Sequence, residues 1–89
     1  MKPIARRNDL VIKEVTGELF IQDLKYEKAV CLNPTSAYVW QKCDGKKDTH
    51  EIATEMRREL GLPVSENLVL FSLNFLSAEH LLENYSSFA

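Results

Sequence analysis

The chain has 89 residues, of which 45 % are hydrophobic and 27 % charged, and its 11 basic and 13 acidic side chains give a formal net charge of −2. These values indicate one globular domain over residues 1–89, with little room for a deep catalytic cavity and without the positive excess of a protein that binds nucleic acid or anionic lipid. No stretch approaches the ~20 apolar residues of a membrane span, and residues 1–9 lack the apolar run of a signal peptide, so we expect a cytoplasmic protein.

Strand-forming residues dominate the first third of the chain. Two runs rich in β-branched and aromatic residues, 10–15 and 18–24, are separated only by Thr16 and Gly17. A two-residue connection that ends in glycine predicts a tight hairpin, because glycine adopts positive φ without steric cost. A short polar turn then leads to a third predicted strand over residues 28–32. The three strands should form an antiparallel meander with the third strand at an edge.

Two helices are predicted next. Asn33 is a favoured N-cap and Pro34 suits the first helical position, so a helix is expected over residues 34–43. Asp48 and Glu51 have the spacing of a capping box, and Gly61 is typical of the position after a helix, so a second helix lies between them. The residues expected to face the core are Ala37, Trp40 and Cys43 in the first helix and Ile52, Ala53, Met56 and Leu60 in the second.

A third helix is predicted over residues 65–82, with Ser65 as its N-cap and Val64 packing on Val69. It contains no Lys or Arg, yet it carries apolar side chains on more than one face. At about 100° per residue, one face holds Val69, Leu73, Leu76 and His80 with Ser72 beside it, and another holds Leu68, Phe71, Phe75 and Ala78. One stripe can close the core, and the other either faces a partner or is also packed in the core.

Three strands followed by three helices indicate the α+β class, in a winged-helix-like unit with a three-stranded antiparallel sheet followed by a three-helix bundle. Residues 83–89 have weak periodicity, and we expect a tail prone to fraying, with Tyr85 and Phe88 as the side chains that could dock. In the third strand Lys28 is the only charged residue. Because proteins normally blunt an exposed edge with charge or proline, an open edge indicates use by a peptide or by a second copy of the chain.

Cys31, Cys43, His50 and His80 are the only soft metal-ligand candidates. They form neither a C-x-x-C nor an H-x-x-x-H pattern, so no metal site is predicted. A disulfide is not expected in a reducing cytosol. Cys43 closes a helix, where the negative end of the dipole disfavours a thiolate nucleophile. The sequence therefore predicts no catalytic residue.

Five short blocks along the chain are similar, at matching spacings, to those of a known family. They are Leu32-Asn33-Pro34-Thr35, Val39-Trp40, Cys43-Asp44-Gly45, Glu51-Ile52-Ala53 and Leu81-Leu82. In these blocks the chain resembles, from about Leu10 to Glu83, the pyrroloquinoline quinone biosynthesis protein D family, whose members are also called RiPP recognition elements. His80 stands where the family usually has Gly, and Asp48-Thr49 replaces the more usual Thr-Val.

The resemblance implies a non-catalytic adaptor without a cofactor. Family members bind the leader segment of a ribosomally made precursor peptide and present it to a modifying enzyme, often a radical S-adenosylmethionine enzyme or, in lasso-peptide pathways, a protease. The leader adds as an extra strand to the third strand and packs against the third helix, a mode known as β-augmentation. The peptide-binding residues expected on this basis are Lys28, Ala29, Val30, Cys31, Leu32, Asn67, Leu68, Phe71, Asn74, Phe75 and Ala78.

A winged-helix DNA-binding domain and a dimerisation module are the alternatives. A DNA-binding domain places Arg and Lys on its recognition helix, whereas the third helix and its end carry Glu66, Glu79 and Glu83. The pairs Lys46-Lys47 and Arg57-Arg58 form a small basic patch that is more typical of a solvated face. We therefore expect neither nucleic acid nor a membrane as a partner, and a homodimer remains open.

Overall fold

Three antiparallel strands form the sheet in the computed structural model, which describes residues 2–85. Strands β1 (Leu10–Val15), β2 (Glu18–Asp23) and β3 (Lys28–Leu32) lie in the order β1-β2-β3. The predicted strands are thus confirmed, except that β2 ends at Asp23, one residue earlier than expected. The Asp23 side chain begins a turn there, since it accepts hydrogen bonds from the backbone N–H groups of Lys25 and Tyr26.

The turn between β1 and β2 fixes the hydrogen-bond pattern of the sheet. Thr16 and Gly17 have φ values of 53° and 83°, as a type I′ turn requires. Val15 and Glu18 close this turn, so they exchange both of their backbone hydrogen bonds, and bonded and non-bonded pairs then alternate along the ladder. Bonded pairs should recur at every second residue, and Asp9 lies six residues before Val15. The Leu24 N–H donates to the Asp9 carbonyl at 2.8 Å, which agrees with this alternation.

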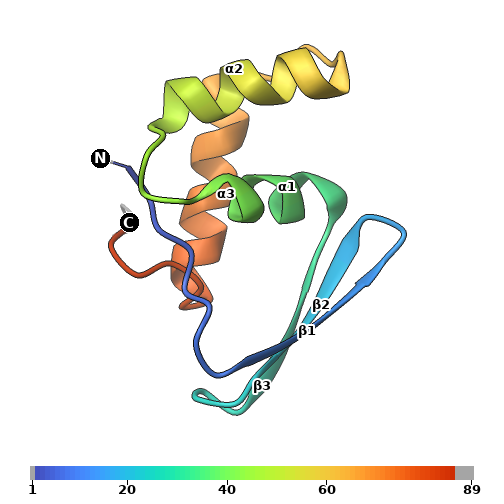
Figure 1. Ribbon diagram of the computed structural model, residues 1–89, viewed down its shortest axis with the longest axis vertical. Helices are drawn as coiled ribbons and strands as arrows, with labels where there is room; N and C mark the ends of the chain where they lie inside the picture. Colours follow the sequence, from blue (N-terminus) through green and yellow to red (C-terminus); the bar gives the residue numbers. More distant parts are fainter. Residues whose placement is uncertain (1, 86–89) are drawn as a thin grey trace.

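Three helices follow the sheet: α1 (Pro34–Lys42), α2 (Thr49–Leu60) and α3 (Glu66–Ala78). Figure 1 shows α2 lying across one end of α3, with α1 in front of α3 and the sheet extending from the start of α1. The predicted caps are confirmed, because the side chains of Asn33, Asp48 and Ser65 each accept a backbone hydrogen bond at a helix start. Gly61 ends α2 in the left-handed conformation.

The core lies among the three helices, and α1 closes it against the inner face of β2 and β3. Trp40 is almost completely buried and donates a hydrogen bond of 3.0 Å from Nε1 to the Leu81 carbonyl. The other apolar residues buried here include Leu19, Ile21, Val30, Leu32, Ala37, Val39, Cys43, Ile52, Ala53, Met56, Val69, Leu73 and Leu76. The prediction that Leu60 faces the core is wrong, since it is exposed in the last turn of α2.

Helix α3 ends four residues before the predicted boundary, so the expectation of a helix to residue 82 is wrong. His80 has a φ of 61°, and the N–H of Leu81 donates to the Leu76 carbonyl at 2.9 Å while that of His80 donates to Ser77 at 3.0 Å. These two bonds form a Schellman motif, in which the residue after the helix is left-handed. The prediction that His80 lies on the core face is therefore wrong. Its side chain is exposed and stacks on the Tyr26 ring.

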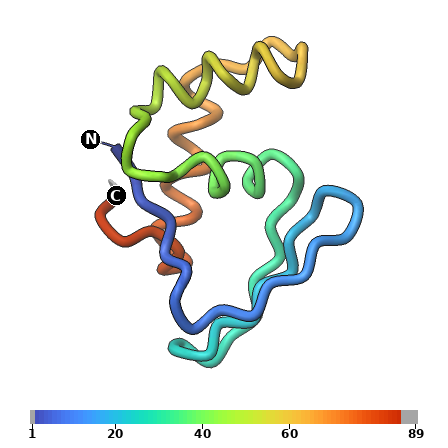
Figure 2. Tube along the Cα trace, in the orientation of Figure 1, coloured from blue at the N-terminus to red at the C-terminus, as the bar shows by residue number. Residues whose placement is uncertain are grey.

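The N-terminal segment and the end of the described chain lie side by side (Figure 2). Isolated antiparallel bridges pair Ile4 with Asp44 and Ala5 with Leu82, and the Glu83 N–H donates to the Ile4 carbonyl at 2.8 Å. Tyr85 packs partly buried against the core. Residues 83–85 therefore do not form the frayed tail that was predicted, while Phe88 and the rest of residues 86–89 lie outside the described residues.

Candidate functional site

The free edge of the sheet belongs to β3. Val30 pairs with Ile21 of β2, and by the alternation set at the first turn this pair exchanges its backbone hydrogen bonds. The N–H and C=O groups of Ala29 and Cys31 therefore point away from the sheet. No strand or bridge within residues 2–85 pairs with them. The structure thus leaves open the edge that the sequence indicated.

Side chains of β3 alternate between the two faces of the sheet. Val30 and Leu32 are buried against the helices, Lys28 is half-buried, and Ala29 and Cys31 are exposed. On the exposed side an open hollow of about 910 Å³ covers the outer face of the sheet, and Ala29 and Cys31 lie at its β3 side with Phe20 next to them. The sequence analysis missed this apolar outer face, although Val11 and Phe20 alternate with inward residues in β1 and β2.

Helix α3 carries one buried and one exposed apolar stripe. Val69, Leu73 and Leu76 are completely buried. By contrast Leu68 is 40 % exposed, Phe71 75 % and Phe75 37 %, and Ala78 is also exposed. The alternative in which both stripes are packed in the core is therefore wrong. The second stripe offers apolar surface to solvent, which is unusual for aromatic side chains in a small domain without a partner.

An ion pair shows which flank of α3 lies towards β3. Lys28 Nζ is 2.9 Å from Glu79 Oε2, which joins the first residue of β3 to the C-cap of α3. At 100° per residue, Phe75 and Leu68 lie within about 40° of Glu79 around the helix axis. These two residues thus share the flank that faces the β3 edge.

The remaining predicted site residues of α3 lie further around the helix. Phe71 and Ala78 are turned from Glu79 by about 80–100°, and Asn67 and Asn74 by about 120–140°. The Asn74 carboxamide accepts a hydrogen bond of 3.1 Å from the Tyr85 hydroxyl. Leu68 and Phe75 therefore share the Glu79 flank of α3, Phe71 lies at the margin of that flank, and Asn74 lies on the opposite flank beside the C-terminal segment.

Arg6, which the sequence analysis did not single out, holds the sheet to the end of α3. Its Nε donates to the His80 carbonyl at 2.8 Å, and its guanidinium pairs with the carboxylate of Asp23, the last residue of β2. Asp23 is completely buried. Burial by itself raises the pKa of this carboxyl, but hydrogen bonds from the Tyr26 amide and from Arg6 outweigh burial and hold the pKa below its ordinary value.

In the described part of the chain, the hydrogen bonds of the two cysteine thiols involve no histidine. Cys43 is buried and its thiol donates to the Val39 carbonyl. Burial raises the pKa of this thiol to about 12, with Arg7 lowering it and Asp44 raising it by smaller amounts, so the thiol stays protonated at neutral pH. Within residues 2–85, no group of three His, Cys, Asp or Glu side chains could hold a metal ion.

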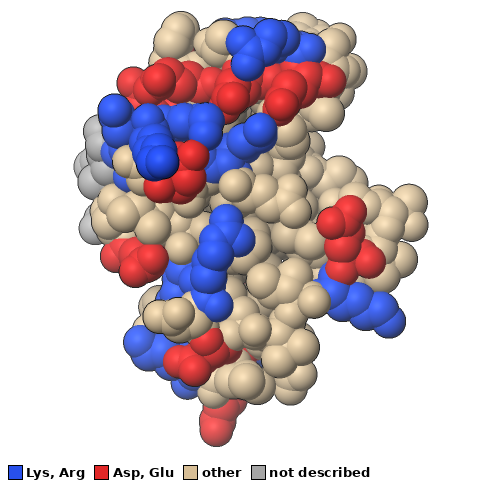
Figure 3. All heavy atoms as spheres, in the orientation of Figure 1, with Lys and Arg blue, Asp and Glu red and all other residues tan. Residues whose placement is uncertain are grey.

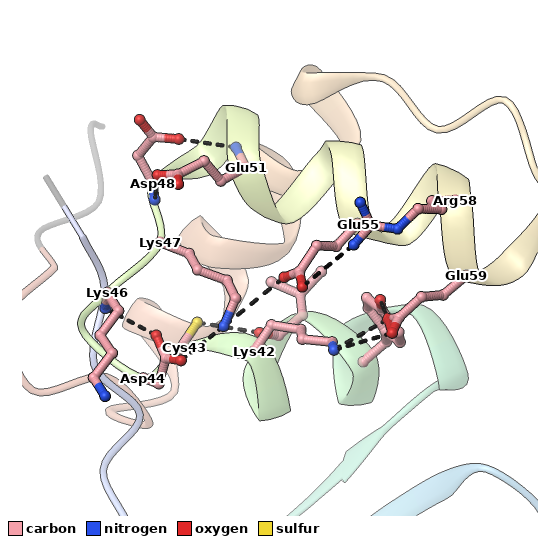
Figure 4. A network of polar contacts seen from close by, with 12 residues as sticks. Lys42, Cys43, Asp44, Lys46, Lys47, Asp48, Glu51, Glu55, Arg58 and Glu59 are labelled. Atoms are coloured by element: carbon pink, nitrogen blue, oxygen red, sulfur yellow. Dashed lines mark hydrogen bonds and ion pairs between the residues drawn. The ribbon is translucent and has the colours of Figure 1, made fainter.

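Most of the basic patch predicted on the helices is engaged in ion pairs or hydrogen bonds. In the view of Figure 3 charged side chains gather over α2 and the loop before it, with both signs interleaved. Figure 4 shows Lys47 between Asp44 at 2.7 Å and Glu55 at 3.8 Å, and Arg58 beside the same Glu55. Arg57 donates to a backbone carbonyl. These cations are partly neutralised within the chain, which does not favour phosphate binding.

The fold and this surface define a winged-helix-like α+β domain with an open strand edge beside an exposed apolar helix flank. Residues 18–82 match the family model described as Coenzyme PQQ synthesis protein D (PqqD), so the chain belongs to the PqqD family. Among solved structures it is similar to TbiB1, in complex with the TbiA(beta) leader peptide, with a TM-score of 0.72 and 20 % identity over 93 % of this chain and 99 % of that chain. No curated protein matches the chain. Of the helices in residues 2–85, none has the length and apolar character to span a membrane.

Proposed function

We propose that this chain is a non-catalytic adaptor, which binds the leader segment of a ribosomally made precursor peptide and presents it to a modifying enzyme. Membership of the PqqD family supports this proposal, as does the similarity to TbiB1, which was solved in complex with a leader peptide. The observation that carries it is the unpaired backbone of Ala29 and Cys31 beside the exposed flank of α3.

An extended peptide on this edge would become the fourth strand of the sheet. Its main chain would bond to Ala29 and Cys31 at the usual strand spacing of about 4.8 Å, and these bonds supply affinity without regard to sequence. Its side chains would alternate between two surfaces. Those on the inner side would meet Leu68 and Phe75 of α3, and those on the outer side would lie beside Phe20 in the hollow on the sheet.

The partner enzyme would supply the chemistry. Cys43, the only cysteine in the described core, is protonated and bonded to the Val39 carbonyl of α1, so it is not available as a nucleophile. A radical S-adenosylmethionine enzyme or a lasso-pathway protease would act on the peptide held at β3. The protein is expected to work in the cytoplasm, where such precursors are made.

Amide hydrogen exchange tests the binding mode directly. The probe is a synthetic peptide corresponding to the N-terminal half of the short precursor encoded beside this gene. On binding, the amides of Ala29 and Cys31 should become protected from exchange. The amides of Ile12 and Glu14, which point outward from the other edge by the same alternation, are the matched control and should not change.

Three results would contradict the proposal. They are protection at Ile12 and Glu14 in place of β3, no binding of the precursor peptide, or turnover of that peptide by the purified chain alone. A mobility shift with random duplex DNA at low salt tests the alternative class. We expect no shift, because Lys47 and Arg58 of the basic patch are paired with carboxylates.

A further inference from the structure

Two contacts close the space between the start of β3 and the end of α3. Lys28 pairs with Glu79 at 2.9 Å, with the two side chains 29 % and 33 % exposed. Beside them the Tyr26 ring stacks on His80, with ring centroids 4.3 Å apart. Because the Lys28–Glu79 pair is partly exposed, solvent and a bound peptide can reach it, and its partners can exchange.

Charges of both signs gather around this point, since Arg6 and Lys25 line the hollow beside Tyr26 and His80 together with Asp9 and Glu83. The Nζ atom of Lys25 and the guanidinium of Arg6 both lie 5.4 Å from the Tyr26 ring, and Lys28 Nζ lies 5.9 Å from it. Arg6 is committed to the buried Asp23 and Lys28 to Glu79. Lys25 has no ion-pair partner among residues 2–85. Lys28 is thus the cation of this cluster that lies on β3 itself, and one partly exposed carboxylate holds it.

The alternation of β3 places Lys28 on the same face as Val30 and Leu32, the face towards α3. A strand added to β3 would therefore present three inward side chains, at every second position, opposite Lys28, Val30 and Leu32. The positions opposite Val30 and Leu32 adjoin the apolar flank of Leu68 and Phe75. The position opposite Lys28 adjoins the ion pair instead.

We infer that Lys28 selects a carboxylate side chain in the bound peptide and so sets the register in which the peptide pairs with β3. This inference rests on the proposed function. The peptide would carry Asp or Glu at one inward position and apolar residues at the next two, each two residues apart. In the free protein Glu79 holds Lys28. The peptide carboxylate would compete with Glu79 and replace it as the partner of Lys28.

The test is selection from a displayed library of random 12-residue peptides on the folded protein. The native chain should enrich peptides with two apolar residues and one acidic residue at alternate positions. Lys28→Gln should keep the apolar pattern and lose the acidic preference, whereas Lys28→Arg should retain it. Lys46→Gln is the control, because Lys46 is an exposed lysine in the loop before α2, outside the hollow and the β3 edge.

Titration of one selected peptide and its Asp→Asn or Glu→Gln counterpart then measures the preference. On the native chain the acidic form should bind about threefold to fivefold more tightly, the size of one partly exposed ion pair. The ratio should fall to about one for Lys28→Gln and rise for Glu79→Gln, which removes the internal competitor. Circular dichroism confirms that each variant is folded.

The outcomes separate this inference from the proposed function. Enrichment of alternating apolar residues without an acidic preference, or a preference that survives Lys28→Gln, overturns the role of Lys28 and leaves the peptide adaptor intact. A library that yields no peptide dependent on the β3 edge contradicts the proposed function and this inference with it.

Discussion

Arg6 and Asp23 form an ion pair between the N-terminal segment and the last residue of β2, and the carboxylate in this pair is completely buried. The same guanidinium bonds to the carbonyl of His80, which follows α3. One side chain thus connects the sheet to the end of the helix whose flank faces the β3 edge. The position of the proposed peptide site depends on this connection.

Replacement of Arg6 by Ala should destabilise the fold more than loss of an exposed pair does. The variant leaves the Asp23 carboxylate buried without its charge partner, whereas Lys47→Ala removes a cation from a partly exposed pair with Asp44. Thermal melts of the two variants make the comparison. Equal melting temperatures for Arg6→Ala and Lys47→Ala would show that the buried pair contributes no more to stability than the partly exposed pair.

Stability should decrease in acid, and Asp23 should contribute to this decrease. Its pKa in the folded chain lies below the ordinary value, because hydrogen bonds from the Tyr26 amide and Arg6 outweigh the effect of burial. The unfolded chain then binds more protons as the pH falls through about 4, so the contribution of Asp23 is full above that pH and is lost below it. Denaturant melts between about pH 6 and 2.5 measure this, and Asp23→Asn should flatten the curve.

Proline substitutions along β3 should separate binding from folding. In Cys31→Pro the missing N–H is one that points to the free edge, so the fold should persist while peptide affinity falls at least about fivefold, the value of one main-chain hydrogen bond. In Val30→Pro the missing N–H is one that bonds to β2, so the sheet itself should be weakened. A folded Cys31→Pro variant with native affinity would exclude this edge as the binding site.

Truncation of the aromatic residues on α3 should affect binding more than stability. Phe71 and Phe75 are exposed, so Phe→Ala should lower affinity for the peptide by about 1–3 kcal/mol, the scale of an aromatic anchor, with a smaller effect on unfolding. Phe75, on the flank towards β3, should have the larger effect. Leu73→Ala is the control, since Leu73 is completely buried and its loss should destabilise the fold by about 2–5 kcal/mol. Melting of both Phe variants as early as Leu73→Ala would contradict the assignment.

Local signals in the sequence predicted most of the fold. Gly17, the Asn33-Pro34 pair and the Asp48 capping box each act within a few residues, and each stands where it was expected. The end of α3 was missed because the usual glycine is replaced by His80, which adopts the same left-handed conformation. The apolar periodicity of the sequence also favoured a helix that continues to residue 82. Leu81 is buried, but the Schellman turn buries it and not a continuing helix.

The candidate site was only partly predictable. The strand at the edge and the apolar stripe were visible as patterns, and the structure confirms that both are open. Alternation alone does not tell whether Val30 or its neighbours point their amides outward, because that depends on the register set at the Thr16 turn. The contacts of Arg6 with Asp23 and His80 link residues 17 and 74 positions apart, which no local pattern reveals.

The pairing of the two terminal segments has a consequence for how this domain can be built into larger proteins. Ala5 and Leu82 lie opposite each other, and the Asn84 side chain bonds to the backbone of Ile4. Figure 1 shows this junction on the side of the molecule away from the β1–β2 hairpin. A short linker could therefore join the ends into a circular chain, or insert the domain into a loop of a host enzyme, without crossing the strand edge. An adaptor inserted in this way would stay near its host enzyme at a fixed effective concentration, so the two would not have to meet by diffusion.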